Sequence, residues 1–237
     1  MARSGARPRP VRVRIREIVA ASDPSFPAAY RIMKRIFAAA EMMPLGDWAQ
    51  TLREREQGLW TDIAWHLLVV ERDGKPVGAA SGTYLGNLNI GVVGYVAVIP
   101  VARALGLGPR LRRRLRAAFE RDARRLRERP LEAIIGEVRE DNPWLRSLVK
   151  RQGALALDLP YYQPALGAGG EAVPLVLYYE PLNRPRRSLG AAELRRLLYT
   201  LFRRAYRIPR PLTHPAFRRM LKALSGRRRI GQRRLAP

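Results

Sequence analysis

The feature that most constrains the fold is a run from Gly94 to Arg114, in which an apolar segment passes through glycines into a long arginine-rich helix. Gly106 and Gly108 permit a positive φ and a close approach of the main chain, so that backbone N–H groups can point into one concavity. That concavity would lie at the positive end of the following helix, where an anion is stabilised. Pro109 suits the first helical position, because its missing N–H would have no partner there. The run predicts a strand, a glycine turn and a helix that together hold a phosphate group.

A loop that only turns a corner would also account for two glycines after a strand. The three glycines of the dinucleotide fingerprint are absent, and no Gly-Lys-Ser or Gly-Lys-Thr supplies a nucleotide-triphosphate loop. The run instead resembles the acyl-CoA loop of the GCN5-related N-acetyltransferases, the GNAT superfamily. In that family a strand ending in Val-x-Pro is followed by Arg or Gln, two residues, Gly, one residue, and Gly or Ala. The matching positions here are Val98, Pro100, Arg103, Gly106 and Gly108.

A second stretch resembles the family's passage from a strand into the next helix, in which Val is followed four residues later by Asn. The residues that carry it are Glu137, Val138, Arg139 and Asn142. The resemblance covers about residues 11–182. It implies an α/β fold (α+β in some schemes), with a single GNAT domain whose central, mostly antiparallel mixed sheet is splayed in the middle. It also implies acetyl-CoA as co-substrate, no metal, and acetyl transfer to an amine by direct attack on the thioester.

The resemblance also implies which groups hold the coenzyme. The pyrophosphate would lie on the backbone from Arg103 to Gly108, although the Arg103 guanidinium could equally cover this loop from outside. An N–H of the strand from Val96 to Val98 would polarise the thioester carbonyl. Asn142 would contact the coenzyme, cap the helix that starts at Pro143, or do both. The expected coenzyme-binding residues are Val96, Ala97, Val98, Arg103, Ala104, Leu105, Gly106, Leu107, Gly108 and Asn142.

The departing thiolate needs a proton, and the usual donor of the family is absent. The family often places a tyrosine acid four residues before the glycine that ends this helix, and here that position is Val149. Tyr161 and Tyr162, near the end of the next strand, are substitutes, as is Tyr95. Paired tyrosines at a strand end also serve as packing residues whose hydroxyl contacts water. Both a proton-donor role and a packing role therefore stay open.

For the base that deprotonates the amine, the candidates are Glu137, Glu140 and a water chain. Many family members carry a structural glutamate at the position of Glu137, which is the competing interpretation. The expected catalytic residues are Tyr162, Tyr161 and Glu137. Neither His66 nor His214 has a partner at metal-ligand or triad spacing, and His66 is expected to be a satisfied core or edge histidine.

The acceptor amine, on a small molecule or a protein, would enter beside two loops that flank the site in the family. These loops span Glu41 to Trp48 and Gln163 to Glu171. Met42, Met43, Leu45 and Trp48 would form an apolar wall. Glu41 and Asp47 would recognise an ammonium group.

The spacing of apolar residues and turn signals predicts the order of elements along the domain. It predicts a strand, two helices, three strands, a helix, a strand, a helix and two strands, over Val11–Val19, Ser25–Ala40, Asp47–Gln57, Trp65–Arg72, Val77–Leu85, Ile90–Ile99, Pro109–Glu128, Leu131–Val138, Pro143–Gln152, Leu155–Tyr162 and Val173–Tyr179. Asp47 is the expected cap of its helix.

Residues 183–237 are expected to form a basic helical C-terminal extension. From Arg184 to Pro237 there are 17 Arg or Lys and one acid, Glu193, against 28 basic and 19 acidic residues before them. A polyanion contact and arginine-rich coding bias remain alternative explanations. Two apolar stripes, around Leu194 and Phe217, predict amphipathic helices that pack on the domain or on a second copy in a homodimer. A basic anchor is the competing interpretation.

The remaining features bound the class of protein. The chain has no cysteine, so disulfides, thiolate nucleophiles and cysteine-ligated zinc are excluded. Residues 1–10 are expected to be a disordered basic tail. The uncharged run from Pro76 to Ala102 is interrupted by prolines and polar residues, which favours two buried strands over an integral membrane segment. The leading hypothesis is a cytoplasmic N-acetyltransferase. The alternative is a catalytically inactive acyl-CoA-binding protein that docks on nucleic acid or membrane through its arginine-rich tail.

Overall fold

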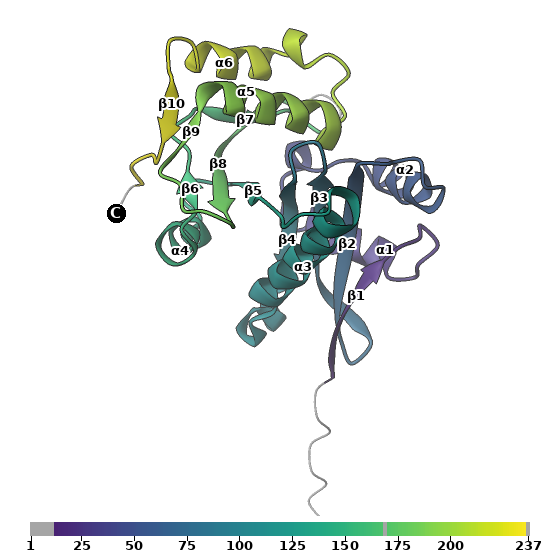
Figure 1. Ribbon diagram of the computed structural model, residues 1–237. Coiled ribbons are helices and arrows are strands. Elements are labelled where there is room, and N and C mark those ends of the chain that lie inside the picture. Colours follow the sequence, from purple (N-terminus) through teal and green to yellow (C-terminus); the bar gives the residue numbers. More distant parts are fainter. Residues whose placement is uncertain (1–11, 168–169, 236–237) are drawn as a thin grey trace, which may run out of the picture.

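The computed structural model describes residues 12–167 and 170–235 and shows a mixed α/β fold (Figure 1). The predicted N-terminal tail over residues 1–10 lies outside them. In this part of the chain a main sheet of eight strands has the order β1-β2-β3-β4-β5-β8-β6, and β7 pairs with β8. A smaller sheet contains β9 and β10. The strands are β1 (Val13–Ile18), β2 (Ile63–Arg72), β3 (Lys75–Leu85), β4 (Ile90–Val98), β5 (Ala133–Val138), β6 (Leu155–Ala156), β7 (Tyr161–Gln163), β8 (Val173–Pro181), β9 (Ser188–Gly190) and β10 (Arg229–Gly231).

Helices cover both faces of the main sheet. The α-helices are α1 (Phe26–Lys34), α2 (Leu45–Glu56), α3 (Leu107–Arg127), α4 (Pro143–Gln152), α5 (Ala191–Thr200) and α6 (Pro215–Ala223). Short 3₁₀ turns are η1 (Ala39–Glu41), η2 (Pro100–Leu105) and η4 (Pro211–Thr213), and η3 (Leu201–Ala205) is a π-helical turn. Among the described residues, no helix is both long and apolar enough to cross a bilayer. The uncharged run after Pro76 forms most of β3 and β4.

The alternation of buried residues along β2 separates two cores. Leu68 and Val70 pack under α3, whereas Leu67 and Val69 pack under α1 and α2. This period of two is what a strand with both faces covered requires. In the other half of the sheet, α4 covers the face shared with α3, and α5 and α6 cover the opposite face.

The splay expected in the middle of the sheet occurs between β4 and β5. These strands pair in parallel only from Ile90 opposite Ala133 to Val93 opposite Gly136. The other strand pairs of the main sheet are antiparallel. β4 continues to Val98 along β3, with an irregularity in that pairing next to Gly94. The two strands therefore diverge and leave an opening between their carboxyl-terminal parts.

The start of α3 differs in detail from the sequence-based prediction. Gly106 has the expected left-handed conformation, with φ of +63°. Gly108, however, is the second residue of the helix and has no positive φ, and Pro109 is the third residue rather than the first. The helix begins earlier because the left-handed Gly106 alone reverses the chain after η2, so only one glycine is needed for the turn.

Three other predicted elements begin or end at different residues in the structure. The helix from Ser25 stops at Lys34, and residues up to Glu41 form η1 after a short break. Pro44 precedes α2, so Asp47 lies inside the first turn and is not the cap. The strand expected over residues 155–162 is divided into β6 and β7, because Pro160 between them cannot donate a ladder hydrogen bond.

The C-terminal helices pack on the rest of the molecule. The apolar stripe of α5 and that of α6, centred on Leu194 and Phe217, share one core with strands β4, β5 and β8. Figure 1 shows the two helices side by side over β7 and β9. Several arginines of this segment pair with acids of the preceding domain. Arg204 binds Asp62, and Arg207 binds Glu54 at 2.7 Å.

The expectation of a satisfied core histidine at His66 is confirmed. Its Nδ1 lies 2.7 Å from Glu17 and its Nε2 2.6 Å from Asp122. Burial by itself would lower the pKa of His66, but the hydrogen bonds to the two carboxylates outweigh it and raise that pKa. The pKa of Glu17 falls to about 2, because His66 and Arg55 overcome the cost of burying the carboxylate. The cluster ties β1 and β2 to α3.

Replacing His66 with Gln should destabilise the fold by about 3 kcal/mol, since it removes the cation shared by two carboxylates and leaves Glu17 only Arg55, and Asp122 only Arg125, as a partner. The loss should be greatest between pH 4.5 and 6.5, where both carboxylates are ionised and the imidazole is protonated. It should shrink as pH rises through the raised pKa of His66 and as pH falls toward 2. Urea unfolding at several pH values measures it. His214→Gln, at the cap of α6, is the matched control and should cost only about 1 kcal/mol. Equal losses for both variants would contradict the assignment.

Candidate coenzyme and acceptor site

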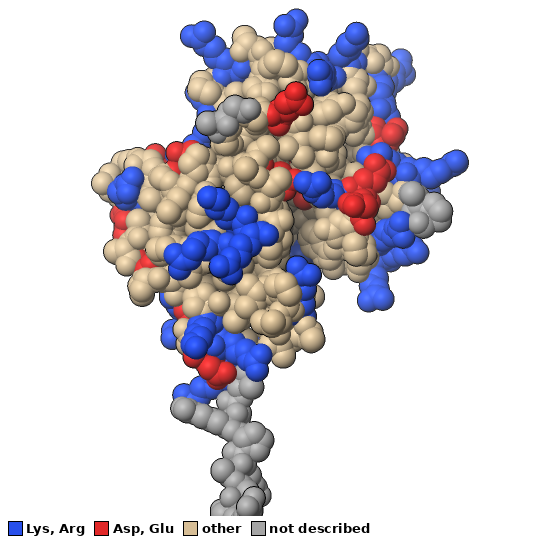
Figure 2. Space-filling view, turned by 180° about the vertical axis from the view of Figure 1, so that it is seen from behind, with Lys and Arg blue, Asp and Glu red and all other residues tan. Residues whose placement is uncertain are grey.

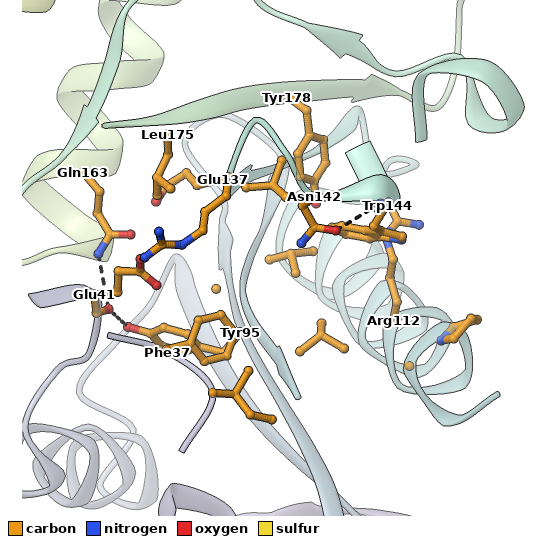
Figure 3. Close-up of a pocket in the computed structure, with 18 residues that line it drawn as sticks. Phe37, Glu41, Tyr95, Arg112, Glu137, Asn142, Trp144, Gln163, Leu175 and Tyr178 are labelled. Carbon is orange, nitrogen blue, oxygen red and sulfur yellow. Dashed lines mark hydrogen bonds and ion pairs between the residues drawn. The ribbon is translucent and has the colours of Figure 1, made fainter. Parts of the chain in front are cut away.

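A cavity of about 370 Å³ lies where β4 and β5 diverge (Figure 3). One end is formed by Gly108 and Pro109 at the start of α3, and the other by Glu41 and Gln163. Between these ends the lining comes from β4, β5, α4 and the residues after α1. It is mainly apolar and aromatic, with polar groups at Arg112, Glu137, Arg139, Asn142 and Tyr178. The opening therefore joins a helix start to a buried carboxylate.

The start of α3 offers backbone donors to an anion. The first N–H groups of an α-helix have no partner within the helix, which here means those of Leu107 and Gly108. The N–H of Gly106 is already bonded to the carbonyl of Arg103. Arg103, Ala104 and Leu105 form the last turn of η2, so the expected open loop is partly 3₁₀ helix.

The Arg103 side chain covers this region from outside. It is exposed, and its Nε donates to the carbonyl of Val98 at 3.4 Å. Of the strand residues named from the sequence, Val96 lines the cavity, whereas Ala97 is buried under α1 and Val98 packs toward α3. Asn142 is the cap of α4, as expected. Its Oδ1 accepts from the N–H of Trp144 at 3.0 Å, and it lines the cavity.

Glu137 is the central acidic group of the site. Tyr161 donates to its Oε1 at 2.6 Å, and Tyr206 donates to the same oxygen. The two phenol oxygens are 2.8 Å apart. Burial raises the pKa of Glu137 to about 7, the Tyr161 hydrogen bond opposes this, and the nearby Glu41 carboxylate adds to it. A carboxylate that titrates near neutrality is suited to exchange protons with a substrate.

The structure separates the other proton-transfer candidates from this cluster. Tyr162 points away from the cavity lining, and the guanidinium of Arg219 lies 5.7 Å from its ring centroid. Glu140 is exposed and pairs with Arg233 at 2.9 Å. Tyr95 lines the cavity, but its hydroxyl donates to the carbonyl of Glu41 at 2.5 Å. Tyr161 thus reaches the site only through its hydrogen bond to Glu137, and Tyr162 lies outside it.

The acidic groups expected to recognise an ammonium lie in different settings. Glu41 is buried, lines the cavity, and accepts from Arg139 at 2.5 Å. Gln163 donates to the Glu41 carbonyl at 3.2 Å, which joins the two flanking loops. Asp47 is exposed in the first turn of α2. Part of the second loop, residues 168–169, lies outside the described residues.

A second, smaller cavity of about 60 Å³ meets the first at Glu137 and Gly94. Its walls are mostly apolar and aromatic. They come from α2, the central strands and the C-terminal segment, with Met43, Trp48, Trp65, Leu166, Ala205 and Tyr206 among them. Glu137 therefore stands between a long cavity that starts at α3 and a short aromatic one.

Sequence reasoning missed Tyr206, Tyr178 and Arg112. Tyr206 follows the π-helical turn η3, which continues α5 and which the predicted amphipathic helix did not distinguish. The unusual turn is a signal of function that sequence periodicity does not reveal. Tyr178 and Arg112 had been assigned to a strand and a basic helix face. No cluster of three or more metal-binding side chains occurs in residues 12–167 and 170–235.

The family follows from comparison of the sequence itself. Residues 31–154 match the model of the acetyltransferase (GNAT) family. This is more than half of the chain, which therefore belongs to that family. A search of curated proteins found no match.

Solved structures share the fold. A protein from Bacteroides thetaiotaomicron, described as a GNAT-family acetyltransferase, is 18% identical, with a TM-score of 0.57 over 81% of this chain and 98% of its own. An acetyltransferase from Salmonella typhimurium, described with its cofactor acetyl-CoA, is 18% identical with a TM-score of 0.51, over 73% and 95%. The ribosomal-protein-alanine N-acetyltransferase of Brucella melitensis is 23% identical with a TM-score of 0.50, over 71% and 99%.

Gly108→Leu should weaken acetyl-CoA binding at least tenfold, about 1.4 kcal/mol, because a side chain would enter the space in front of the α3 N–H groups. A Cβ at Gly108 meets nothing within 4 Å, so the fold should tolerate it, and the helix should gain stability. Gly46→Leu is a matched control, since Gly46 is also the second residue of a helix with open space around it. Titration calorimetry and thermal melting measure both variants. If Gly108→Leu binds acetyl-CoA as tightly as wild type, the pyrophosphate does not lie on the N–H groups at the start of α3.

Proposed function

We propose that this protein is an acetyl-CoA-dependent N-acetyltransferase that transfers acetyl to an amine by direct attack on the thioester. The observation that carries the proposal is the position of Glu137, a carboxylate with a pKa near 7 at the junction of two cavities. One cavity runs from the start of α3 to Glu137 and would hold the coenzyme, and the other would bring a second substrate to the same carboxylate. Membership of an acetyltransferase family supports this assignment.

The longer cavity fits the coenzyme. The pyrophosphate would accept hydrogen bonds from the N–H groups of Leu107 and Gly108, aided by the positive end of α3. The pantetheine arm would lie along β4 beyond Val93, where pairing with β5 has ended. The backbone N–H and C=O groups of β4 that face the opening would there form hydrogen bonds with the amides of the arm. Asn142 would contact the arm from the start of α4. In this position the thioester would reach Gly94 and Glu137.

Glu137 would accept the proton of the incoming amine. Ammonium groups are not nucleophilic, so the amine must lose a proton before or during attack. Tyr161 and Tyr206 hold the carboxylate at the cavity junction and stabilise its charged form. An N–H of β4 near the splay would bind the carbonyl oxygen of the thioester as negative charge develops there.

The short cavity favours an amine with a slender apolar or aromatic part. Trp48, Trp65 and Met43 form its walls, and aromatic faces also attract cations. The C-terminal segment closes one side through Tyr206. The amine belongs to a small molecule or to a protein chain end that enters beside Glu41.

The pH profile tests the role of Glu137. Turnover should fall as pH drops below about 7, because the carboxyl becomes protonated and stops accepting a proton. Glu137→Gln should reduce kcat about 100-fold or more, while acetyl-CoA binding is retained. Glu140→Gln, at an exposed glutamate three residues away, is the control and should leave kcat unchanged. Free-thiol release with a panel of amines, polyamines and peptide N-termini measures turnover. Equal kcat for both variants would remove Glu137 from catalysis.

Tyr161→Phe should move the acid limb of the kcat profile to higher pH. The Tyr161 hydroxyl bonds to the charged form of Glu137 and lowers its pKa, so loss of that bond lets burial raise the pKa further. Tyr162→Phe, next to it on β7, is the matched control and should leave the limb in place. A profile that shifts equally in both variants, or in neither, would contradict the proposed cluster.

A non-catalytic acyl-CoA-binding role remains the alternative. Binding of acetyl-CoA without thiol release from any amine would favour it, and absence of binding would defeat both proposals. The proposed polyanion contact stays a prediction. Figure 2 shows Lys and Arg side chains in separate groups on one face, with fewer Asp and Glu side chains and with other residues over most of the surface. An electrophoretic shift assay with nucleic acid at several salt concentrations tests it through its salt dependence.

A further inference from the structure

Two buried side-chain polar atoms in the described part of the chain lack a hydrogen-bond partner of good geometry, and both belong to residues that line the longer cavity. They are the hydroxyl of Tyr178 and the Nε of Arg112. Tyr178 is fully buried, and Arg112 is 8% exposed. Burying an unpaired polar group costs free energy, so such groups in a cavity point to a ligand that pairs with them.

Gly136 lets Tyr178 reach the splay. Tyr178 on β8 is directly opposite Gly136 on β5, and its ring lies over that glycine. A Cβ at position 136 would lie 2.5 Å from the Tyr178 hydroxyl oxygen, so any other residue there would displace the phenol. Trp144 packs edge-on against the ring with centroids 5.8 Å apart. Figure 3 shows Tyr178 directed into the cavity between Glu137 and Asn142.

Arg112 supplies a fixed positive charge beside this phenol. Its Nη1 donates to Gln152 at 2.8 Å, and its Nη2 is paired with Glu180. Its guanidinium also lies 5.4 Å from the Trp144 ring centroid. These contacts fix the guanidinium beside the second turn of α3 and leave its Nε without a hydrogen-bond partner of good geometry.

Burial raises the pKa of Tyr178, whereas the charge of Arg112 and the interaction of its side chain with the phenol lower that pKa. The phenol is therefore protonated at neutral pH and available as a donor. The hydroxyl lies over Gly136, which precedes Glu137, the group that would deprotonate the amine, on β5. Val149, at the position where the family often has its tyrosine acid, packs in the same core as Tyr178.

We propose that Tyr178 donates its proton to the coenzyme sulfur as the thioester carbon–sulfur bond breaks. The absence of a side chain at Gly136 gives the phenol access to the sulfur, and the positive charge of Arg112 stabilises the phenolate that forms. This inference rests on the proposed acetyl transfer. The amine nitrogen forms the new bond to the acetyl carbon, and the electron pair of the breaking bond goes to sulfur. The proton lost by the amine goes to Glu137. Arg112 stabilises the phenolate until solvent returns a proton to it, and Glu137 releases its proton to solvent, so no proton is gained or lost overall.

Tyr178→Phe tests this in turnover. It should lower kcat with acetyl-CoA at least tenfold, while the KM for acetyl-CoA changes by no more than about twofold. Tyr84→Phe is the matched control, because Tyr84 is also a fully buried tyrosine, but its hydroxyl bonds to Asn89 away from the cavity. That control should keep the wild-type kcat. A Tyr178→Phe variant that is folded by circular dichroism and retains wild-type kcat would overturn the proposal.

A binding experiment tests the sulfur contact independently of acetyl transfer. Coenzyme A and desulfo-coenzyme A, which lacks the sulfur, are titrated into wild type and Tyr178→Phe from pH 6 to 10. If Tyr178 and Arg112 face the sulfur, the affinity of wild type for coenzyme A should rise relative to the desulfo form above pH 8.5, the unperturbed thiol pKa. The rise should be reduced in Tyr178→Phe. Identical ratios in both proteins would overturn the contact even if acetyl transfer is confirmed. A wild type that shows the rise without thiol release would defeat the proposed function but keep the contact.

Discussion

The rest of the structure depends on the point where β4 and β5 stop pairing. Up to Val93 and Gly136 the two parallel strands satisfy each other's backbone groups, and beyond them the strands part. A backbone group left without a partner must find water or a ligand. The splay therefore creates the cavity and also provides its polar edge. The start of α3 lies at one end of this opening, Glu41 and Gln163 at the other and Glu137 between them (Figure 3), so one break in the sheet positions the groups of the proposed coenzyme site.

The C-terminal segment is part of the site as well as of the core. Its helices bury their apolar stripes against β5, β7 and β8, which fixes the position of the turn at η3. That turn directs Tyr206 to Glu137 and places Arg204 opposite Asp62. Some of the excess arginine of this segment is therefore used inside the molecule, in ion pairs with acids of the preceding residues. The segment and the acetyltransferase fold consequently meet at the carboxylate on which the proposed chemistry depends.

Local sequence patterns predicted most elements, because strand alternation and helix punctuation act over a few residues. Gly106, the Asn142 cap and the buried His66 follow from such local rules. The errors in the predicted elements occurred where one nearby residue changed the local backbone structure. Pro160 divided a predicted strand, and the single left-handed Gly106 made a second turning glycine unnecessary at Gly108.

By itself, the sequence determined the family and most of the order of the domain's strands and helices, since these are carried by contiguous motifs. Only the tertiary structure decided which side chains surround Glu137. Glu137, Tyr161 and Tyr206 lie far apart in the chain, and they meet because β5, β7 and the turn after α5 pack together. Likewise, Tyr178 enters the cavity because Gly136 has no side chain on the adjacent strand. Contacts between distant segments depend on packing and register, which no local pattern encodes.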